Sequence, residues 1–190
     1  MLRISGFLMV CILAVWVSSP AASGGEGRVE PCREATRQFA STLKGELVGA
    51  LRQGGPVFAL GVCRDRAPAI AGAVSAERGL RIGRTALKVR NRQNAPDPWE
   101  RAVLESFEER KAGGEALPVL ERYEVVEEEG GRVLRYMKAI PTGEVCLVCH
   151  GTAVAPDVRA GLRTLYPEDR ATGFGAGDIR GAFTVSMPLD

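Results

Sequence analysis

The sequence predicts a single α+β domain in which helices pack on an antiparallel sheet. Three observations predict this class. Apolar residues recur at helical spacing in residues 32–52, and two strand-like stretches at residues 123–127 and 132–139 are joined by the short segment Glu128 to Gly131. A last strand-like stretch follows at residues 181–188. Helices and antiparallel strands in this order favour an α+β domain.

The first 23 residues have the pattern of an export signal. Arg3 is followed by the eleven-residue apolar run Phe7 to Val17, and the small residues Ala21 to Ser23 suit a leader peptidase. The run is shorter than the ~18 apolar residues of a membrane span. We therefore expect residues 1–23 to be a signal peptide and the protein to be exported to a periplasmic or other extracytoplasmic space. The alternative is an uncleaved anchor, with residues 6–19 spanning a thinned bilayer.

Residues 24–190 have the size of one domain and a nearly neutral charge. The whole chain carries 25 basic and 23 acidic residues, and loss of Arg3 with the leader leaves a net charge of +1. This balance argues against a nucleic-acid partner or another polyanion, and we expect no membrane contact after leader cleavage. The length is sufficient for one hydrophobic core.

Two helices are expected in the first third of the domain. Residues 24–29 would be a short disordered start, followed by a helix over residues 32–52 that Gly54-Gly55 would end. Residues 67–78 predict a second helix, and Gly79 stops it.

A strand and a capped helix are expected next. Residues 80–89 predict the strand, and residues 91–96 predict a loop. Asp97 would then cap a third helix, with Glu100 completing a capping-box pair. A short helical piece is expected near residues 158–165. The buried face of the third helix would consist of Trp99, Val103, Leu104 and Phe107.

The most specific motif is Cys146-Leu147-Val148-Cys149-His150, which has the C-x-x-C-H pattern of c-type haem attachment. Two cysteines three residues apart lie on one side of a helical turn, with about 5–6 Å between their Cβ atoms. Both sulfurs can therefore form thioethers with the two vinyl groups of one porphyrin. The next residue, His150, is then held where its imidazole reaches the iron. We expect one covalent haem c.

Two other interpretations of this motif are weaker. A zinc site would need two more ligands, which Cys32 and Cys63 would have to supply. A redox-active disulfide of the thioredoxin type would be expected at the start of a helix that follows a strand, whereas residues 141–143 indicate a loop before the motif. Neither interpretation explains the histidine that follows the second cysteine.

The second axial ligand of the iron is open to several residues. His150 is the only histidine, so two histidines from one chain cannot both bind the iron. The other side of the iron takes a methionine, a cysteine or another donor, or stays open, and the candidate residues are Cys63, Cys32, Met137 and Met187. Cys63 is favoured because it lies near a probable helix start with Arg64 and Arg66 close by, which would stabilise a thiolate. A buried inert thiol or a disulfide with Cys32 is the alternative for Cys63. For the two methionines, packing is the expected role.

Several segments resemble a known family, the PAS-like c-type cytochromes with histidine and cysteine as haem ligands, long classed as a domain of unknown function. Val62-Cys63 followed by Ala67 to Ala71 is similar to its cysteine-bearing helix start. Gly83 to Asn91, continuing through Asn94-Ala95-Pro96 to Trp99-Glu100, resembles its most distinctive block. Cys146 to Gly151 matches its haem site, and Gly181 to Leu189 resembles its closing strand. Together these segments span residues 35–189.

The resemblance implies that Cys63 is the second axial ligand, opposite His150. It also implies a PAS-like antiparallel sheet flanked by helices, with the haem in a pocket of that domain. Members of the family look like sensory parts of larger signalling proteins, whereas for this sequence, which ends at Asp190, we expect no output domain. Cys32 has no counterpart in this resemblance.

Four polar residues are candidate contacts of the haem propionates. Buried carboxylates need cations or hydrogen-bond donors, and alternate residues of a strand share one face. We therefore consider Arg84, Lys88, Arg90 and Asn91 as propionate contacts. The alternative is that they form a solvated strand face.

Three functions are compatible with these residues. The first is an electron carrier or redox-responsive module, because a thiolate opposite His150 would stabilise ferric iron; its redox partner is unknown. The second is a sensor or binding module, in which Cys63 leaves the iron on reduction and a small ligand such as carbon monoxide or nitric oxide binds. The third is a peroxidase or a haem enzyme of sulfur metabolism, for which the chain offers no distal histidine and no visible catalytic constellation.

Overall fold

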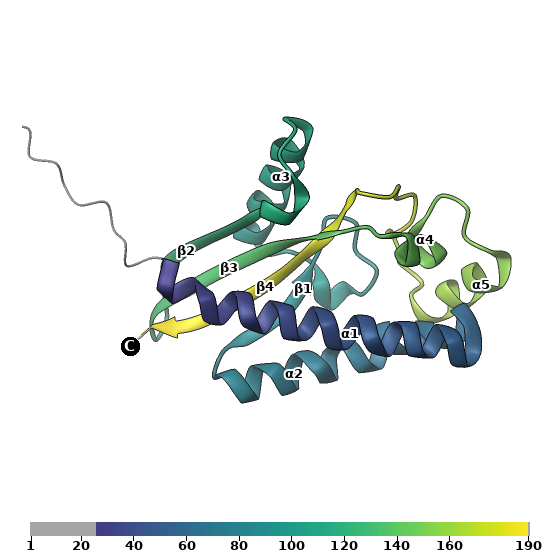
Figure 1. The fold of residues 1–190 in the computed structure, drawn as a ribbon, viewed down its shortest axis with the longest axis horizontal. Helices are drawn as coiled ribbons and strands as arrows, with labels where there is room; N and C mark the ends of the chain where they lie inside the picture. Colours follow the sequence, from purple (N-terminus) through teal and green to yellow (C-terminus); the bar gives the residue numbers. More distant parts are fainter. Residues whose placement is uncertain (1–25, 190) are drawn as a thin grey trace, which may run out of the picture.

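The computed structural model describes residues 26–189, so the expected signal peptide lies outside the described residues. The described part contains helices on both faces of one antiparallel sheet (Figure 1). Among its helices, none combines the length and the apolar character that a bilayer crossing needs. The helices are α1 (Glu26–Gly61), α2 (Ala67–Arg78), α3 (Pro98–Ala112), α4 (Glu144–His150) and α5 (Pro156–Leu165), and the strands are β1 (Arg81–Thr85), β2 (Glu121–Glu128), β3 (Gly131–Pro141) and β4 (Ile179–Leu189).

The four described strands form one sheet in the order β1-β4-β3-β2, and every neighbouring pair is antiparallel. The β2–β3 pair is the predicted hairpin. Strand β4 then lies between β3 and β1, so the end of the sequence forms the centre of the sheet. The predicted α+β class, with an antiparallel sheet flanked by helices, is confirmed.

Helices α1 and α2 cover one face of the sheet (Figure 1). Phe39 of α1 packs edge-on against Phe183 of β4, with the ring centroids 5.5 Å apart. The expectation of a disordered start at residues 24–29 is wrong for residues 26–29, because α1 begins at Glu26 and the side chain of Val29 is fully buried, while residues 24 and 25 lie outside the described residues. The predicted break at Gly54-Gly55 is present as a kink, since Gly55 has a φ of 73° that only glycine adopts readily.

Helix α3 covers the opposite face of the sheet. Asp97 accepts a hydrogen bond from the backbone N–H of Glu100 (2.8 Å), and the Glu100 carboxylate accepts one from the backbone N–H of Asp97 (3.1 Å). The predicted capping box is therefore confirmed. Val103, Leu104 and Phe107 form the buried face of α3, as predicted from their spacing, whereas Trp99, which was predicted with them, is only partly buried against the same cluster.

The strand predicted over residues 80–89 is too long. β1 ends at Thr85, and the backbone N–H of Ala86 donates to the carbonyl of Asn94 (3.2 Å) rather than to a strand. Lys88 and Arg90 therefore do not alternate with Arg84 along one strand face, and the face predicted for these three residues does not exist.

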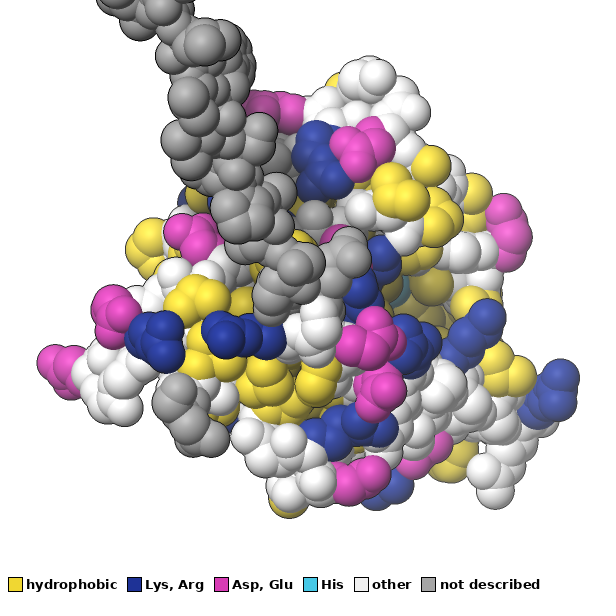
Figure 2. All heavy atoms as spheres, turned by 60° about the vertical axis from the view of Figure 1, so that its left-hand side comes forward, with side chains coloured by type: hydrophobic (Ala, Val, Ile, Leu, Met, Phe, Trp, Pro, Cys, Tyr) yellow, Lys and Arg dark blue, Asp and Glu magenta, His cyan; other side chains and the backbone are white. Residues whose placement is uncertain are grey.

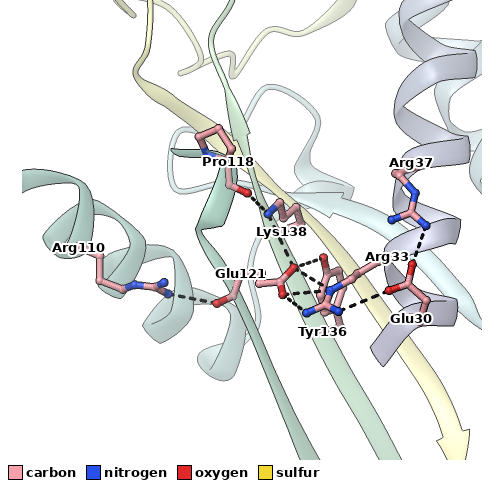
Figure 3. A network of polar contacts seen from close by, with 8 residues as sticks. All are labelled: Glu30, Arg33, Arg37, Arg110, Pro118, Glu121, Tyr136 and Lys138. Carbon is pink, nitrogen blue, oxygen red and sulfur yellow. Dashed lines mark hydrogen bonds and ion pairs between the residues drawn. The ribbon is translucent and has the colours of Figure 1, made fainter. Parts of the chain in front are cut away.

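A polar network ties the first turns of α1 to the hairpin (Figure 3). The Glu121 carboxylate accepts hydrogen bonds from the Arg33 Nε (3.1 Å) and from the Tyr136 hydroxyl (2.9 Å). Its members lie on the first turns of α1, on the edge strand β2 and in the middle of β3, whereas the helix α4, which carries the cysteines of the C-x-x-C-H motif, follows the end of β3 (Figure 1).

Candidate functional site

Helix α4 carries the two cysteines of the C-x-x-C-H motif. The helix begins after Gly143 and ends at His150, so Cys146 and Cys149 lie one turn apart, as expected from their spacing. Both side chains are half-buried. Burial raises the pKa of the Cys149 thiol. This short helix, which follows the end of β3, thus presents both sulfurs to the same side.

His150 is oriented by the segment before β4. Its Nδ1 lies 2.6 Å from the carbonyl oxygen of Ala171, so Nδ1 carries the proton and donates this hydrogen bond. The lone pair on Nε2 is then available to a metal. Nε2 lies 3.4 Å from both the Arg90 Nη1 and the Arg180 Nε. Burial and, to a lesser degree, these two guanidinium groups lower the pKa of His150 to about 2, so the imidazole is neutral.

The chain beside His150 requires a glycine at position 151. The carbonyl of His150 accepts from the N–H of Phe174, and the carbonyl of Gly151 accepts from the N–H of Gly173, both at 3.0 Å. A Cβ at Gly151 would lie 2.6 Å from the Leu147 carbonyl oxygen, closer than two such atoms can approach. The glycine therefore lets α4 end and dock against this segment within one residue.

A cavity of about 450 Å³ lies beside α4, a volume within the usual range for small-molecule sites. It is lined by Cys146, Cys149 and His150 from α4 and by Cys63 from the helical layer. Apolar side chains of α1, including Leu43, form much of the remaining wall. The structure thus brings the four predicted haem-contacting residues to one cavity, although Cys63 is more than 80 residues from the motif in sequence.

Cys63 lies in a single π-helical turn, Val62–Arg66, between α1 and α2. The predicted electrostatic setting of this thiol is wrong. Arg64 pairs with Asp65 (2.7 Å) and Arg66 pairs with Glu46 (2.7 Å), so neither guanidinium is free to stabilise a thiolate. The residue is also inside a nearly continuous helical stretch rather than at a helix start.

Three arginines surround the cavity in place of the two expected. Arg84, Arg90 and Arg180 all line it, and the buried Arg90 pairs with Asp169 at 3.0 Å. Burial lowers the pKa of Arg84, and burial together with Arg90 lowers that of Arg180 to about 10. Within residues 26–189, neither Arg84 nor Arg180 forms an ion pair, and the buried Arg90 Nε has no hydrogen-bond partner. The cavity therefore has an uncompensated positive charge.

The remaining propionate candidates have different positions. Asn91 lines the cavity, and its side chain accepts from the backbone N–H of Gln93 (3.0 Å). Lys88 lies outside the cavity, where its Nζ is 5.0 Å from the centre of the Phe174 ring. Arg180 and Asp169 were missed by sequence reasoning, because each lies far from the motif and no local pattern marks it.

The other sulfur-containing residues considered as iron ligands, Met137, Met187 and Cys32, do not line the cavity. Met137 is fully buried against α3, and Met187 packs with the core under α1, so neither lines the cavity. Cys32 is fully buried in the core, and burial raises its pKa to about 11. The predicted packing role of both methionines agrees with these positions.

The geometry is unfavourable to the two interpretations that use Cys32. Arg66, three residues after Cys63, pairs with Glu46, and Cys32 is about 20 Å from Glu46 along α1 at 1.5 Å per residue. A disulfide needs Cα atoms about 4.4–6.8 Å apart, so Cys32 and Cys63 cannot form one. Among the described residues, no three His, Cys, Asp or Glu side chains converge as a metal ion such as zinc would require.

The surface has no extended region of one charge in the view of Figure 2, where basic and acidic side chains are interspersed. Among the described residues, several charged side chains are paired, as in the exposed ion pair between Arg92 and Glu168 (3.0 Å). On the face that Figure 2 shows, basic side chains therefore do not gather into one patch.

Comparisons with known proteins point to one family. The family model described as Tll0287-like matches residues 28–188. The crystal structure of the cyanobacterial heme-protein Tll0287 is similar, with 26% sequence identity and a TM-score of 0.66 over 87% of this chain and 97% of that chain. Among curated proteins, none matches the sequence.

Proposed function

This chain belongs to the Tll0287-like family, and on that premise we propose that it is an exported c-type cytochrome with one haem. Cys146 and Cys149 hold the haem through thioethers, and His150 and Cys63 are its axial ligands. Its role is electron transfer or redox response. The similarity to a heme-protein over nearly the whole of both chains supports haem binding.

The observation that carries this proposal is the convergence of four residues on one cavity. Cys63, Cys146, Cys149 and His150 come from two distant parts of the sequence, yet all four line it. The neutral imidazole of His150, held through Nδ1 by a carbonyl, is the usual state of a metal-binding histidine. A cavity of about 450 Å³ with apolar walls suits a flat hydrophobic ligand better than a single metal ion.

The charges of the cavity suit the two propionates of a haem. Arg84, Arg90 and Arg180 carry three positive charges, and the Asp169 carboxylate, which pairs with Arg90, balances one of them. Two carboxylates would neutralise the remainder. The unpartnered Arg90 Nε supplies a buried donor for such an oxygen. We propose Arg84, Arg90 and Arg180 as propionate contacts, with Asn91 as a further polar neighbour.

When bound, the haem supplies reversible one-electron chemistry. The residues of this chain fix its position and its potential. His150 is kept in one tautomer by Ala171, and Cys63 contributes a thiolate that favours the ferric state. A haem held by both His150 and Cys63 would leave no free position for a substrate, which would suit electron transfer rather than catalysis.

The test compares the exported wild-type protein with Cys63→Ala by optical and electron paramagnetic resonance spectroscopy in both oxidation states. We expect a low-spin ferric signal of a thiolate ligand in the wild type and its loss in Cys63→Ala. Cys32→Ala is the matched control, because this cysteine is buried in the core away from the cavity. An unchanged ferric spectrum in Cys63→Ala would remove this residue from the iron.

The mass of the mature protein tests the attachment and the leader together. Covalent haem adds its mass to the chain, and cleavage after residue 23 removes the predicted leader. We expect the periplasmic or other extracytoplasmic fraction to contain the shortened, haem-bearing chain. A colourless protein of the bare polypeptide mass, made in a host that matures c-type cytochromes, would contradict the proposal.

A second function is favoured by the local structure at Cys63. Its π-helical turn, Val62–Arg66, is a type of segment that is frequent at functional sites. If Cys63 leaves the iron on reduction, the protein is a redox or small-ligand sensor. Carbon monoxide binding to the reduced protein separates the two functions, because a carrier that keeps Cys63 on ferrous iron will not bind it.

A further inference from the structure

Ala171, whose carbonyl sets the tautomer of His150, is itself held at both of its peptide groups by charged side chains. Its backbone N–H donates to the Asp169 Oδ1 (2.8 Å), and its carbonyl accepts from the Arg90 Nη2 (3.2 Å) as well as from His150. The Arg90 Nη2 also lies 3.0 Å from the Asp169 Oδ2. Asp169, Arg90 and the backbone of Ala171 thus form a closed ring of polar contacts, into which the imidazole donates.

This ring is shielded from solvent and attached to α4. The side chains of Asp169 and Arg90 are 11% and 6% exposed, and Ala171 is fully buried. The Arg90 Nη2 also donates to the carbonyl of Cys149 (2.7 Å), the residue before His150. Polar contacts are electrostatically stronger in such an interior than in water, and neighbouring hydrogen bonds polarise one another. A change at Asp169 is therefore transmitted to His150 through the ring.

The two oxygens of the Asp169 carboxylate have different partners. Oδ1 holds the N–H of Ala171 and so helps to fix the direction of its carbonyl. Oδ2 faces Arg90 and balances its charge, which limits how strongly the guanidinium draws on the same carbonyl. A stronger bond from the His150 Nδ1–H to this carbonyl makes the imidazole a more basic ligand, which favours ferric iron.

We propose that Asp169 is a positioning residue that sets the orientation and the donor strength of His150 toward the haem iron, acting through the ring described above. The inference rests on the proposed function, since it requires His150 to bind haem iron. It assigns to a carboxylate outside the C-x-x-C-H motif a role in the reduction potential, in addition to its pairing with Arg90.

The test is the midpoint potential of the haem-loaded full chain in Asp169→Asn. This substitution removes the charge that balances Arg90 but keeps a side-chain oxygen for the N–H of Ala171. Outer-shell partners of this kind typically change metal affinity or activity by about 10–100-fold. We expect about a tenfold change in the ratio of ferric to ferrous protein, the lower end of that range. The midpoint potential should therefore rise by about 59 mV, the equivalent of tenfold for a one-electron couple.

Glu168→Gln is the matched control for charge. It makes the same chemical change at the adjacent residue, whose side chain is 60% exposed and pairs with Arg92 on the surface. Solvent and salt screen a charge at such a position, so the potential of Glu168→Gln should equal that of the wild type. Equal shifts in the two variants, or a wild-type potential in Asp169→Asn, would overturn the inference.

Asp169→Ala separates the two oxygens. It removes the charge and also the acceptor for the N–H of Ala171, so the imidazole loses part of its orientation. The g-values of the ferric electron paramagnetic resonance spectrum report the orientation of an axial imidazole. We expect them to change in Asp169→Ala and to stay at the wild-type values in Asp169→Asn and in Glu168→Ala. Wild-type g-values in folded, haem-loaded Asp169→Ala would contradict the positioning role.

A further measurement needs no substitution. In the ferric wild type, the Nδ1–H of an axial histidine gives a hyperfine-shifted proton resonance that exchanges with solvent. Because the bond from His150 to Ala171 is enclosed by the ring, we expect this resonance to persist after transfer to D₂O. Its complete loss in the first spectrum would show that the ring does not hold the histidine.

These outcomes are distinguishable from failure of the proposed function. Each protein is first checked for covalent haem by mass and for a low-spin ferric spectrum. A wild type that lacks covalent haem overturns the proposed function and this inference with it. A haem-loaded wild type whose potential does not depend on Asp169 overturns only the role of this carboxylate.

Discussion

Replacement of Asp169 by asparagine tests whether the Arg90–Asp169 pair is a buried ion pair that supports the cavity. The two side chains are 6% and 11% exposed, and the Arg90 Nη2 lies 3.0 Å from the Asp169 Oδ2. Loss of one partner of a buried pair costs about 3–5 kcal/mol. We expect Asp169→Asn to lower the free energy of unfolding by about 3 kcal/mol, the lower end of that range. The loss is limited because Arg90 keeps its hydrogen bonds to the carbonyls of Cys149 (2.7 Å) and Ala171 (3.2 Å).

The neighbouring ion pair provides the control. Arg92 and Glu168 are also 3.0 Å apart, but their side chains are 81% and 60% exposed. Exposed pairs contribute about 0–1 kcal/mol, so Glu168→Gln should change the free energy of unfolding by less than about 1 kcal/mol. The assay is guanidinium unfolding of the purified full chains, followed by far-ultraviolet circular dichroism. Equal, small effects of the two substitutions would refute the conclusion that Asp169 is shielded from solvent.

Three further predictions concern the fold and the attachment helix. Asp97→Ala removes the capping box and should cost about 1 kcal/mol in the same unfolding assay. Burial raises the pKa of Glu121, but the hydrogen bonds from Arg33 and Tyr136 and the positive charges of Arg33 and Lys138 together outweigh it and hold the pKa below 4.5. This carboxylate therefore stabilises the fold above pH 4.5 and loses that effect at lower pH, so Glu121→Gln should destabilise at pH 7 and progressively less as the pH falls below 4.5. Gly151→Ala places a Cβ 2.6 Å from a carbonyl of α4 and should reduce the fraction of chains with covalent haem by mass spectrometry, whereas Gly143→Ala, with no atom within 4 Å, should not.

The elements that local sequence determines were predicted well. The helix at residues 67–78 has the predicted bounds, and the Asp97–Glu100 capping box is present, because both depend on contacts between residues a few positions apart. The cysteines of the motif lie on one helical turn for the same reason. The start of α1 was missed because Val29 is buried by tertiary packing, which overrides the polar, glycine-containing sequence around it.

Only some of the residues that line the cavity could be predicted from the sequence. Arg84 and Arg90 were found through a local pattern, although the strand assumed for them ends at Thr85 and Lys88 lies outside the cavity. Nothing in the local sequence marks Arg180 or Asp169, whose roles depend on where β4 and the segment before it return to α4. Such residues become visible only when long-range contacts are known.

The charges around the cavity also bear on the choice between a low and a high reduction potential. The cations near His150 would by themselves disfavour ferric haem and raise its potential, whereas a Cys63 thiolate would lower it. Two propionates would cancel the positive charge left by Arg84, Arg90 and Arg180 after Asp169 is counted. The thiolate is then the main uncompensated influence on the iron. We therefore expect a low-potential haem that donates electrons readily.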